Sequence, residues 1–315
     1  MLGPALRAGG HGRMTAAPRV KVGVNLALAK AGAVVALAQR AEACGYESVW
    51  LSDHAALRAD GADIVARYGR LLYRPDADFV SPLVALAAIA QATSTIRIGV
   101  SVLIAPLRNP LLLARDIATL DILSSGRLEL GLGVGWNADE FRAVGADYST
   151  RGARMDEMLD VMRTLFTDER PEFHGRYYGF DPIGFEPKPI QQPGPKLLIG
   201  GTSEAALRRA VRRGDGWLAS GPIDRIMIDA QRARQAWSDA GRTDPFDVMV
   251  TMLDHLPDAD ELDRIAAGGI DRLLISPWQD TGEPRLGTVG VDEADALDHY
   301  ATSIGLRRHQ EVTGR

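Results

Sequence analysis

The sequence contains a single cysteine, Cys44, which excludes an intrachain disulfide and a cysteine-based metal site. The six histidines are scattered, without an HExxH motif or any paired spacing, so we expect no metal site. No apolar run approaches the roughly 20 residues that a membrane span requires, and no membrane partner is expected. Cys44 ends an apolar helical pattern, which favours a thiol packed in the core over a reactive one.

The chain also lacks an excess of positive charge, with a net charge of −5 and a pI near 5.7. Neither nucleic acid nor an acidic membrane surface is therefore an expected partner. Residues 1–18 mix Gly, Pro, Arg and Ala without an apolar segment, so they do not read as a secretory signal. We expect a disordered tail over 1–18, translation starting at Met1 or Met14, and a cytoplasmic protein.

Hydrophobic residues make up 46% of the chain and charged residues 24%, a balance typical of a globular protein with a large core. No linker or internal repeat divides residues 19–315, for which we predict a single domain. Short β-branched runs alternate with helical patterns, as in βαβ units around a parallel sheet. This predicts an α/β fold, a (β/α)8 TIM barrel with insertion loops at its C-terminal face. The predicted strands are Val20–Val24, Ser48–Leu51, Ile96–Leu103, Arg127–Leu132, Lys196–Ile199, Gly216–Ala219, Phe246–Thr251 and Arg272–Ile275.

Two connections, 52–80 and 168–195, are too long for plain βα loops. The second is rich in proline and glycine. Long excursions at strand ends usually build lids or binding walls. A methionine-rich stripe at helical spacing over 155–166 is predicted to be core, because its spacing matches one buried helix face.

Asp53 and His54 follow the second predicted strand, on the face where barrel enzymes carry chemistry. Histidine exchanges protons near neutral pH, and an adjacent carboxylate could orient or charge its ring. The alternative is a strand-ending aspartate that caps the next turn beside an exposed histidine. Spacing alone does not choose between these.

The third predicted strand is apolar, with Gly99 and Ser101 near its end. Small residues there either admit a flat ligand or simply let a buried strand pack. The fourth strand leads into Gly131-Leu132-Gly133-Val134-Gly135-Trp136-Asn137, a weak match to glycine-rich nucleotide loops. Gly135 would let the backbone approach a ligand, and Asn137 could present its amide to a ring. We expect Glu140 to pair with Arg151 or Arg154.

The fifth predicted strand ends in Gly200-Gly201-Thr202, just before an amphipathic helix. Free N–H groups at the positive end of a helix form a ready phosphate site. The apolar stripe of that helix turns four arginines away from the core, and we predict that they face solvent: Arg208, Arg209, Arg212 and Arg213.

Together these segments resemble the luciferase-like monooxygenase superfamily, and most closely its deazaflavin-dependent (coenzyme F420) oxidoreductase branch. The resemblance runs from about Lys21 to Ala219 and depends on motifs in a fixed order and spacing. They are Trp50-Leu51-Ser52-Asp53-His54, Thr119-Leu120-Asp121-Ile122-Leu123-Ser124-Ser125-Gly126-Arg127, the Gly131–Asn137 segment, Arg151-Gly152, Pro187-Lys188-Pro189-Ile190-Gln191, Gly200-Gly201-Thr202 and Gly214-Asp215-Gly216-Trp217.

The resemblance implies a homodimeric TIM barrel with an isoalloxazine-like ring over the strand ends. It places Asp53 and His54 beside the ring and a non-proline cis peptide, Ser101–Val102, behind it. It assigns the phosphate to the Gly200-Gly201-Thr202 segment. The full set of expected cofactor-binding residues is Asp53, Ser101, Val102, Gly135, Asn137, Gly200, Gly201 and Thr202, with Asn25 and Trp136 lining the substrate pocket.

The expected cofactor is coenzyme F420, an 8-hydroxy-5-deazaflavin, and FMN is the alternative. The expected reaction is hydride transfer between this cofactor and a small organic substrate, with His54 and Asp53 as the catalytic residues. The two alternative functions are an FMN-dependent two-component monooxygenase and a non-catalytic flavin-binding barrel. Binding without turnover would favour the last.

Overall fold

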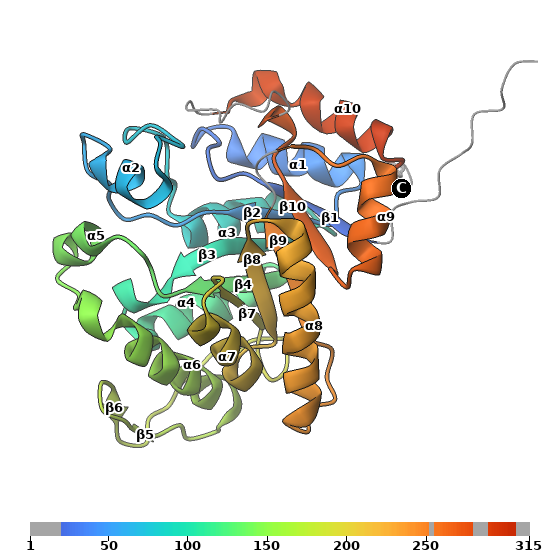
Figure 1. The fold of residues 1–315 in the computed structure, drawn as a ribbon. Helices are drawn as coiled ribbons and strands as arrows, with labels where there is room; N and C mark the ends of the chain where they lie inside the picture. Colours follow the sequence, from blue (N-terminus) through green and yellow to red (C-terminus); the bar gives the residue numbers. More distant parts are fainter. Residues whose placement is uncertain (1–19, 252–254, 280–288, 307–315) are drawn as a thin grey trace, which may run out of the picture.

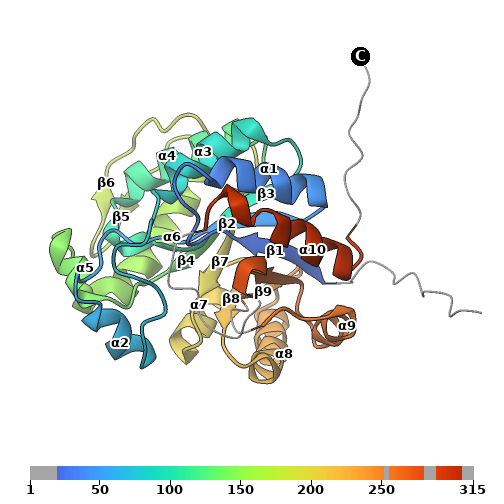
Figure 2. The same cartoon turned by 90° about the horizontal axis from the view of Figure 1, so that it is seen from above.

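The computed structural model describes residues 20–251, 255–279 and 289–306, and the predicted tail 1–18 lies outside them. Eight parallel strands close into a barrel in the order β1-β10-β9-β8-β7-β4-β3-β2, surrounded by helices (Figures 1 and 2). The TIM-barrel prediction is confirmed. The barrel strands are β1 (Lys21–Asn25), β2 (Ser48–Leu51), β3 (Arg97–Ile104), β4 (Leu128–Gly133), β7 (Lys196–Gly200), β8 (Gly216–Ser220), β9 (Asp247–Thr251) and β10 (Arg272–Ile275).

All eight predicted strands are present, and their limits agree with the sequence pattern to within a residue or so. The register between β3 and β4 shifts between Val100 and Leu103. The peptide bond between Ser101 and Val102, inside this irregularity, is cis. The resemblance had implied this cis bond.

The helices form an outer ring around the barrel (Figure 2). The first of them ends at Gly45, whose φ of 85° is the left-handed conformation that glycine adopts readily. The helices are α1 (Val34–Cys44), α2 (Ala62–Tyr68), α3 (Pro82–Ala92), α4 (Pro110–Leu123), α5 (Ala138–Ala143), α6 (Arg151–Thr167), α7 (Glu204–Arg213), α8 (Ile223–Asp239), α9 (Ala259–Ala267) and α10 (Asp295–Ser303). Among the described residues, no helix is long and apolar enough to cross a membrane.

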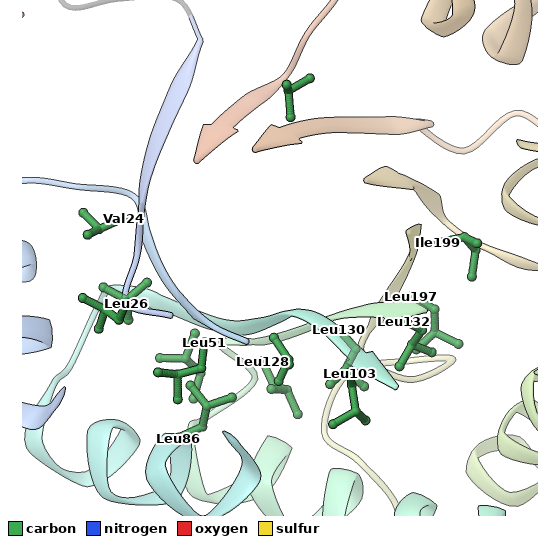
Figure 3. Packing of buried hydrophobic residues seen from close by; sticks show 14 of the residues in the cluster. Val24, Leu26, Leu51, Leu86, Leu103, Leu128, Leu130, Leu132, Leu197 and Ile199 are labelled. Carbon is green, nitrogen blue, oxygen red and sulfur yellow. The ribbon is translucent and has the colours of Figure 1, made fainter. Parts of the chain in front are cut away.

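The main hydrophobic core lies between the barrel strands and the helices. Figure 3 shows part of it, with side chains of β2, β3 and β4 directed toward the surrounding helices. The methionine-rich stripe of α6 is buried here, as predicted. Cys44 is 2% exposed, which confirms its packing role.

The two long connections differ from each other. The first carries α2, with Gly61 and Gly69 at its ends in the left-handed conformation. The second carries a short antiparallel hairpin, β5 (Phe173–His174) and β6 (Gly179–Phe180), which was not predicted. The Glu157 carboxylate of α6 holds this hairpin by accepting hydrogen bonds from three consecutive backbone N–H groups, residues 176–178.

The N-terminal end of the barrel is filled by ion pairs. Arg272 donates to Glu47 at 2.6 Å and to Glu129 at 2.5 Å, and Arg97 contacts Glu129 from the neighbouring strand. Burial by itself would raise the pKa of Glu129, but the charges of Arg272 and Arg97 hold that pKa below its usual range. Lys196 and Asp247 form a further pair at this end. The barrel is therefore closed below by charged side chains that neutralise one another.

Candidate active site

The C-terminal mouth of the barrel is lined by small residues. Side chains alternate between the barrel interior and the helices along each strand. The middle of the interior is filled by the cluster Trp50, Leu198, Leu218, Met249 and Leu274. Two residues further along the strands lies a set of residues that we call the upper layer, in which no side chain is larger than valine. It consists of Asn25, Ser52, Ser101, Val102, Gly133, Gly200, Ser220, Thr251 and Ser276.

Two glycines hold Val102 in place within the upper layer. A Cβ on Gly133 would lie 2.5 Å from Cγ2 of Val102, and one on Gly200 would lie 2.5 Å from Cγ1. Val102 is nevertheless half-buried, so its remaining surface faces the mouth. Ser101 Oγ lies 3.4 Å from Thr251 Oγ1 of β9, a strand that does not neighbour β3 in the barrel. Together they form a closely packed floor across the mouth.

Asp53 follows β2 and is 4% exposed. Its carboxylate accepts two hydrogen bonds from the Arg108 guanidinium, at 2.6 and 2.8 Å, and a third from the Ile104 backbone N–H at 2.8 Å. Asp53 thus fixes the segment that follows β3, next to the cis bond. These bonds occupy both carboxylate oxygens, and they give Asp53 a structural task beside its expected role in binding.

His54 lies in a ring of aromatic side chains. The centroid of its ring is 5.1 Å from that of Phe79, 5.8 Å from that of Trp136 and 6.1 Å from that of Tyr73. The Nε2 atom is 3.4 Å from the Tyr73 hydroxyl. Burial raises the pKa of Tyr73, so this hydroxyl keeps its proton at neutral pH.

The expected pairing of Glu140 with Arg151 or Arg154 is wrong. The side chain of Glu140 is fully buried, its Oε2 lies 3.3 Å from Nδ1 of His54, and its Oε1 accepts from the Ala55 N–H at 2.5 Å. Arg151 instead donates to the carbonyl of Gly135 and stacks on Tyr148. The reason is the direction of the Glu140 side chain, which points across the mouth toward the end of β2 and away from α6. The carboxylate that contacts His54 is therefore Glu140 and not the adjacent Asp53.

The loop after β4 is held from two sides. Trp136 contributes its carbonyl to Tyr148, and its ring lies 5.8 Å from those of His54 and Tyr68. Asn137 is 3% exposed and caps α5 through Oδ1, while its amide donates to Asp63 of α2 at 2.7 Å. Its amide thus joins α2 to α5, which lie side by side in Figures 1 and 2. Asn25, also buried, accepts from the Ala27 N–H at 2.9 Å.

The segment before α7 is exposed at the same end of the barrel. Gly201 has a φ of +117°, which an L side chain rarely adopts, and its carbonyl accepts from Trp217 Nε1 at 2.6 Å. Ser203 caps the helix through the Ala206 N–H. Thr202 is exposed beside this helix start. The segment is therefore exposed beside the start of α7, the Gly201 N–H donates to the Leu218 carbonyl, and the phosphate site there stays a prediction.

The four arginines of α7 do not all face solvent, as had been expected. Arg208 and Arg212 are exposed, but Arg209 donates to Asp156 of α6 at 2.6 Å with its side chain only 9% exposed. Arg213 pairs with Asp160, also on α6. The correction has a simple cause: the two helices pack side by side, and acidic residues on α6 lie opposite alternate arginines.

Several residues of the sequence motifs are structural. Asp121 is fully buried. Its carboxylate accepts two hydrogen bonds from Gln191, one from the backbone N–H and one from the side-chain amide of Gln191. Arg127 donates to the carbonyls of Ala90 and Ile96 and to others nearby. These contacts connect distant segments and explain why the motif spacing is informative about the fold. Within the described residues, no cluster of His, Cys, Asp and Glu could hold a metal ion.

Several residues of the site were not anticipated, among them Arg108, Tyr73 and Glu140. Each contacts a residue far away in the chain, Glu140 being 86 positions from His54 and Arg108 55 from Asp53. The position of Glu140 in the first turn of the helix that follows β4 was the one local signal available, because helices of a barrel begin at the mouth.

An eight-stranded parallel barrel with its polar mouth at the strand C-termini is the arrangement of barrel enzymes. A sequence model of the luciferase-like monooxygenase family matches residues 9–275. The chain belongs to this family, which is one of oxidoreductases and monooxygenases.

Three similar proteins illustrate the range of the family. An uncharacterized protein of Mycobacterium tuberculosis is 32% identical over 247 residues, which are 76% of this chain and 83% of that protein. An FMNH2-dependent dimethylsulfone monooxygenase of Pseudomonas putida is 32% identical over 155 residues, 47% of this chain and 42% of that one. The structure of an F420-dependent secondary alcohol dehydrogenase superposes with a TM-score of 0.72 at 18% identity, covering 92% of this chain and 99% of the other. Flavin- and deazaflavin-dependent enzymes thus both occur among the similar proteins.

Proposed function

We propose that this protein is an oxidoreductase that binds coenzyme F420 at the barrel mouth and transfers a hydride between it and a small organic substrate. The observation that carries the proposal is the upper layer: small residues from all eight strands surround Val102 and leave the mouth to a flat ligand. A barrel filled for stability alone would carry large branched side chains at this level.

The residues present fit such a coenzyme. The hydroxyls of Ser101 and Thr251 and the amide of Asn25 suit a ring with polar edges, and Val102 supplies an apolar contact for its face. The exposed Gly201-Thr202 segment suits a phosphate because it leads into α7, whose first-turn N–H groups favour an anion, although the Gly201 N–H itself donates to the Leu218 carbonyl. When bound, the deazaflavin supplies a carbon that accepts or donates hydride.

His54 is the residue that we assign to proton transfer. Oxidising an alcohol, or reducing a carbonyl, moves a proton on the oxygen as well as a hydride on the carbon. A positioned imidazole at the mouth can act as the acid or base in this step. Trp136 and the other aromatic rings around His54 exclude water from it and form the wall that a substrate would contact.

An FMN-dependent monooxygenase is the second candidate, supported by the Pseudomonas relative and its FMNH2 dependence. The same mouth would hold FMN, with the same segment for its phosphate. The two candidates differ in reactivity: reduced flavin consumes oxygen, whereas a reduced deazaflavin reacts poorly with it.

The test is a titration of the purified protein with F420 and with FMN, each oxidised and reduced, followed by fluorescence quenching. Saturable F420 binding at one site per chain, at least about tenfold (1.4 kcal/mol) tighter than FMN, is expected. Tighter binding of FMN, with oxygen consumption by the reduced complex, would establish the second candidate instead. Binding of neither would refute both.

We also propose that the protein works as a homodimer, through the outer faces of α3 and α4. The sequence of α3, PLVALAAIAQA, is apolar on nearly all sides, and such a helix is usually buried. Val84 of α3 is nevertheless 71% exposed and Leu112 of α4 is 51% exposed, and the two helices pack against each other. A second copy is the simplest cover for this apolar surface.

A further inference from the structure

We propose that Glu140 is the positioning residue of His54: it holds the neutral imidazole with its proton on Nδ1 and leaves Nε2 to accept a proton. The proposal deepens the function proposed above and depends on it for the catalytic role of His54. The orientation of the ring, in contrast, can be tested without any coenzyme.

The first argument is the burial of the Glu140 carboxylate. A buried carboxylate without partners is costly, so its contacts determine its purpose. Its side chain is fully buried, and among the ion pairs of the described residues its partner is His54, not a lysine or arginine. Its second contact is the N–H of Ala55, the next residue in the chain. Both contacts act on the same short segment after β2.

The second argument concerns the tautomer. An ionised carboxylate accepts hydrogen bonds and cannot donate them, so the proton of a neutral His54 ring lies on Nδ1, facing Glu140. The Tyr73 hydroxyl on the other side is protonated and can donate to Nε2, 3.4 Å away. Both neighbours therefore favour the same tautomer. A carboxylate behind a catalytic imidazole is a known means of fixing its orientation and stabilising its charged form.

The chemistry follows from this arrangement. Oxidation of an alcohol would remove a hydride from its carbon, for which a bound deazaflavin would be the acceptor, and a proton from its hydroxyl group. Nε2 of His54 takes that proton, directly or through the Tyr73 hydroxyl, and the ring becomes positively charged beside the Glu140 carboxylate. In the reverse direction the same proton returns to the carbonyl oxygen.

A purely structural role is the competing explanation, because Glu140 also anchors α5 to the chain after β2. Glu140→Gln separates the two. Its side-chain carbonyl can still accept from Ala55, which preserves the anchor. Its NH2 group would face His54 and donate to Nδ1, which would move the ring proton to Nε2.

The test is nitrogen-15 NMR of the histidine rings in coenzyme-free protein above the titration range, with the His54 signals identified by their loss in His54→Gln. We expect the Nδ1–H tautomer in the wild type and the Nε2–H tautomer in Glu140→Gln. The matched control is Asp139→Asn, a neighbouring carboxylate on α5 that pairs with Arg142 and Arg58 and not with His54. It should leave the tautomer unchanged.

Kinetics supply the second readout. In coenzyme-loaded protein, Glu140→Gln should lower kcat by about 10²–10⁴-fold with little change in KM, the range for a positioned acid–base group. An Nε2–H ring in the wild type, or the same tautomer in wild type and Glu140→Gln, would overturn the proposal. If Glu140→Gln does not fold, Tyr73→Phe still tests it: Nδ1–H must persist when the hydroxyl is removed. If the tautomers behave as expected but no coenzyme binds, the proposed function fails and the positioning role of Glu140 stands.

Discussion

The contact between Val102 and its two glycines allows a quantitative test of the floor beneath the proposed ring. In Gly200→Ala, the new Cβ would lie 2.5 Å from Cγ1 of Val102. Non-bonded carbons prefer about 3.5–4.0 Å, so the overlap exceeds about 1 Å. Rotation of Val102 gives no relief, because valine is stiff about χ1 and its other methyl meets Gly133.

The expected cost follows from overpacking. Gly200→Ala should destabilise the protein by about 1–3 kcal/mol. Val102→Ala removes two methyl groups and should cost less than about 1.5 kcal/mol, because about 0.8 kcal/mol applies to each fully buried group and Val102 is half-buried. In the double variant the overlap is absent, so it should be no less stable than Val102→Ala alone. The coupling free energy should therefore be about 1–3 kcal/mol.

The assay is urea unfolding of the four proteins, with Gly184→Ala as a matched control. A Cβ at Gly184 meets nothing within 4 Å, so the control should stay within about 1 kcal/mol of the wild type. The F420 titration on the same proteins should show weaker binding in Gly200→Ala, because Val102 is pushed toward the mouth. Additive free energies, with Gly200→Ala as harmless as the control, would refute the close packing of this floor.

Four further predictions follow from the site and the fold. His54→Ala should bind coenzyme nearly normally but lower kcat by at least about tenfold, and hydride transfer at the wild-type rate in a stopped-flow experiment would limit His54 to lining the site. Gly201→Leu should lower stability, because its φ of +117° is unfavourable for a side chain, and the folded variant should bind coenzyme more weakly because the side chain blocks the start of α7; an unchanged Kd would count against the phosphate assignment. Light scattering at micromolar concentration should give a dimer mass for the wild type and a monomer mass for the double variant Val84→Glu with Leu112→Glu; a wild-type monomer would contradict the dimer. The depressed pKa of Glu129 adds stability that is present above the ordinary glutamate pKa and is lost as pH falls through the lower pKa of the folded state. Glu129→Gln should cost about 3–5 kcal/mol at pH 7 in urea unfolding and should weaken this loss of stability at acidic pH. Parallel pH profiles of the unfolding free energy in the two proteins would exclude the effect.

The sequence was most informative about the barrel strands and the outer core. Their signals are local: a β-branched run, an apolar stripe or a glycine after a helix each depends on a few neighbouring residues. The β5–β6 hairpin escaped prediction because two-residue strands leave no periodicity to read. The prolines around it correctly indicated an excursion without indicating its pairing.

The site was predicted less completely, for a physical reason. His54 and the segment before α7 were proposed from sequence because strand ends and helix starts have local signatures. Glu140 and Arg108, which contact His54 and Asp53, lie in segments that follow other strands, and their identity depends on the closed geometry of the mouth. From sequence alone, Glu140 could equally reach an arginine on the following helix. The direction of α5, which only the structure shows, decides that it faces His54.

The ion pairs that close the lower end of the barrel have a kinetic consequence. With charged side chains below and the Trp50 cluster above them, molecules can enter and leave through one opening only. A coenzyme ring on Val102 would lie deepest, and a substrate reaching His54 would lie over it. Binding and release would then follow a compulsory order. The coenzyme would bind before the substrate, and the product would leave before the coenzyme. A compulsory order of this kind would appear in steady-state kinetics as product inhibition in which the oxidised and reduced coenzymes compete with each other, while the organic product is a mixed inhibitor toward the substrate.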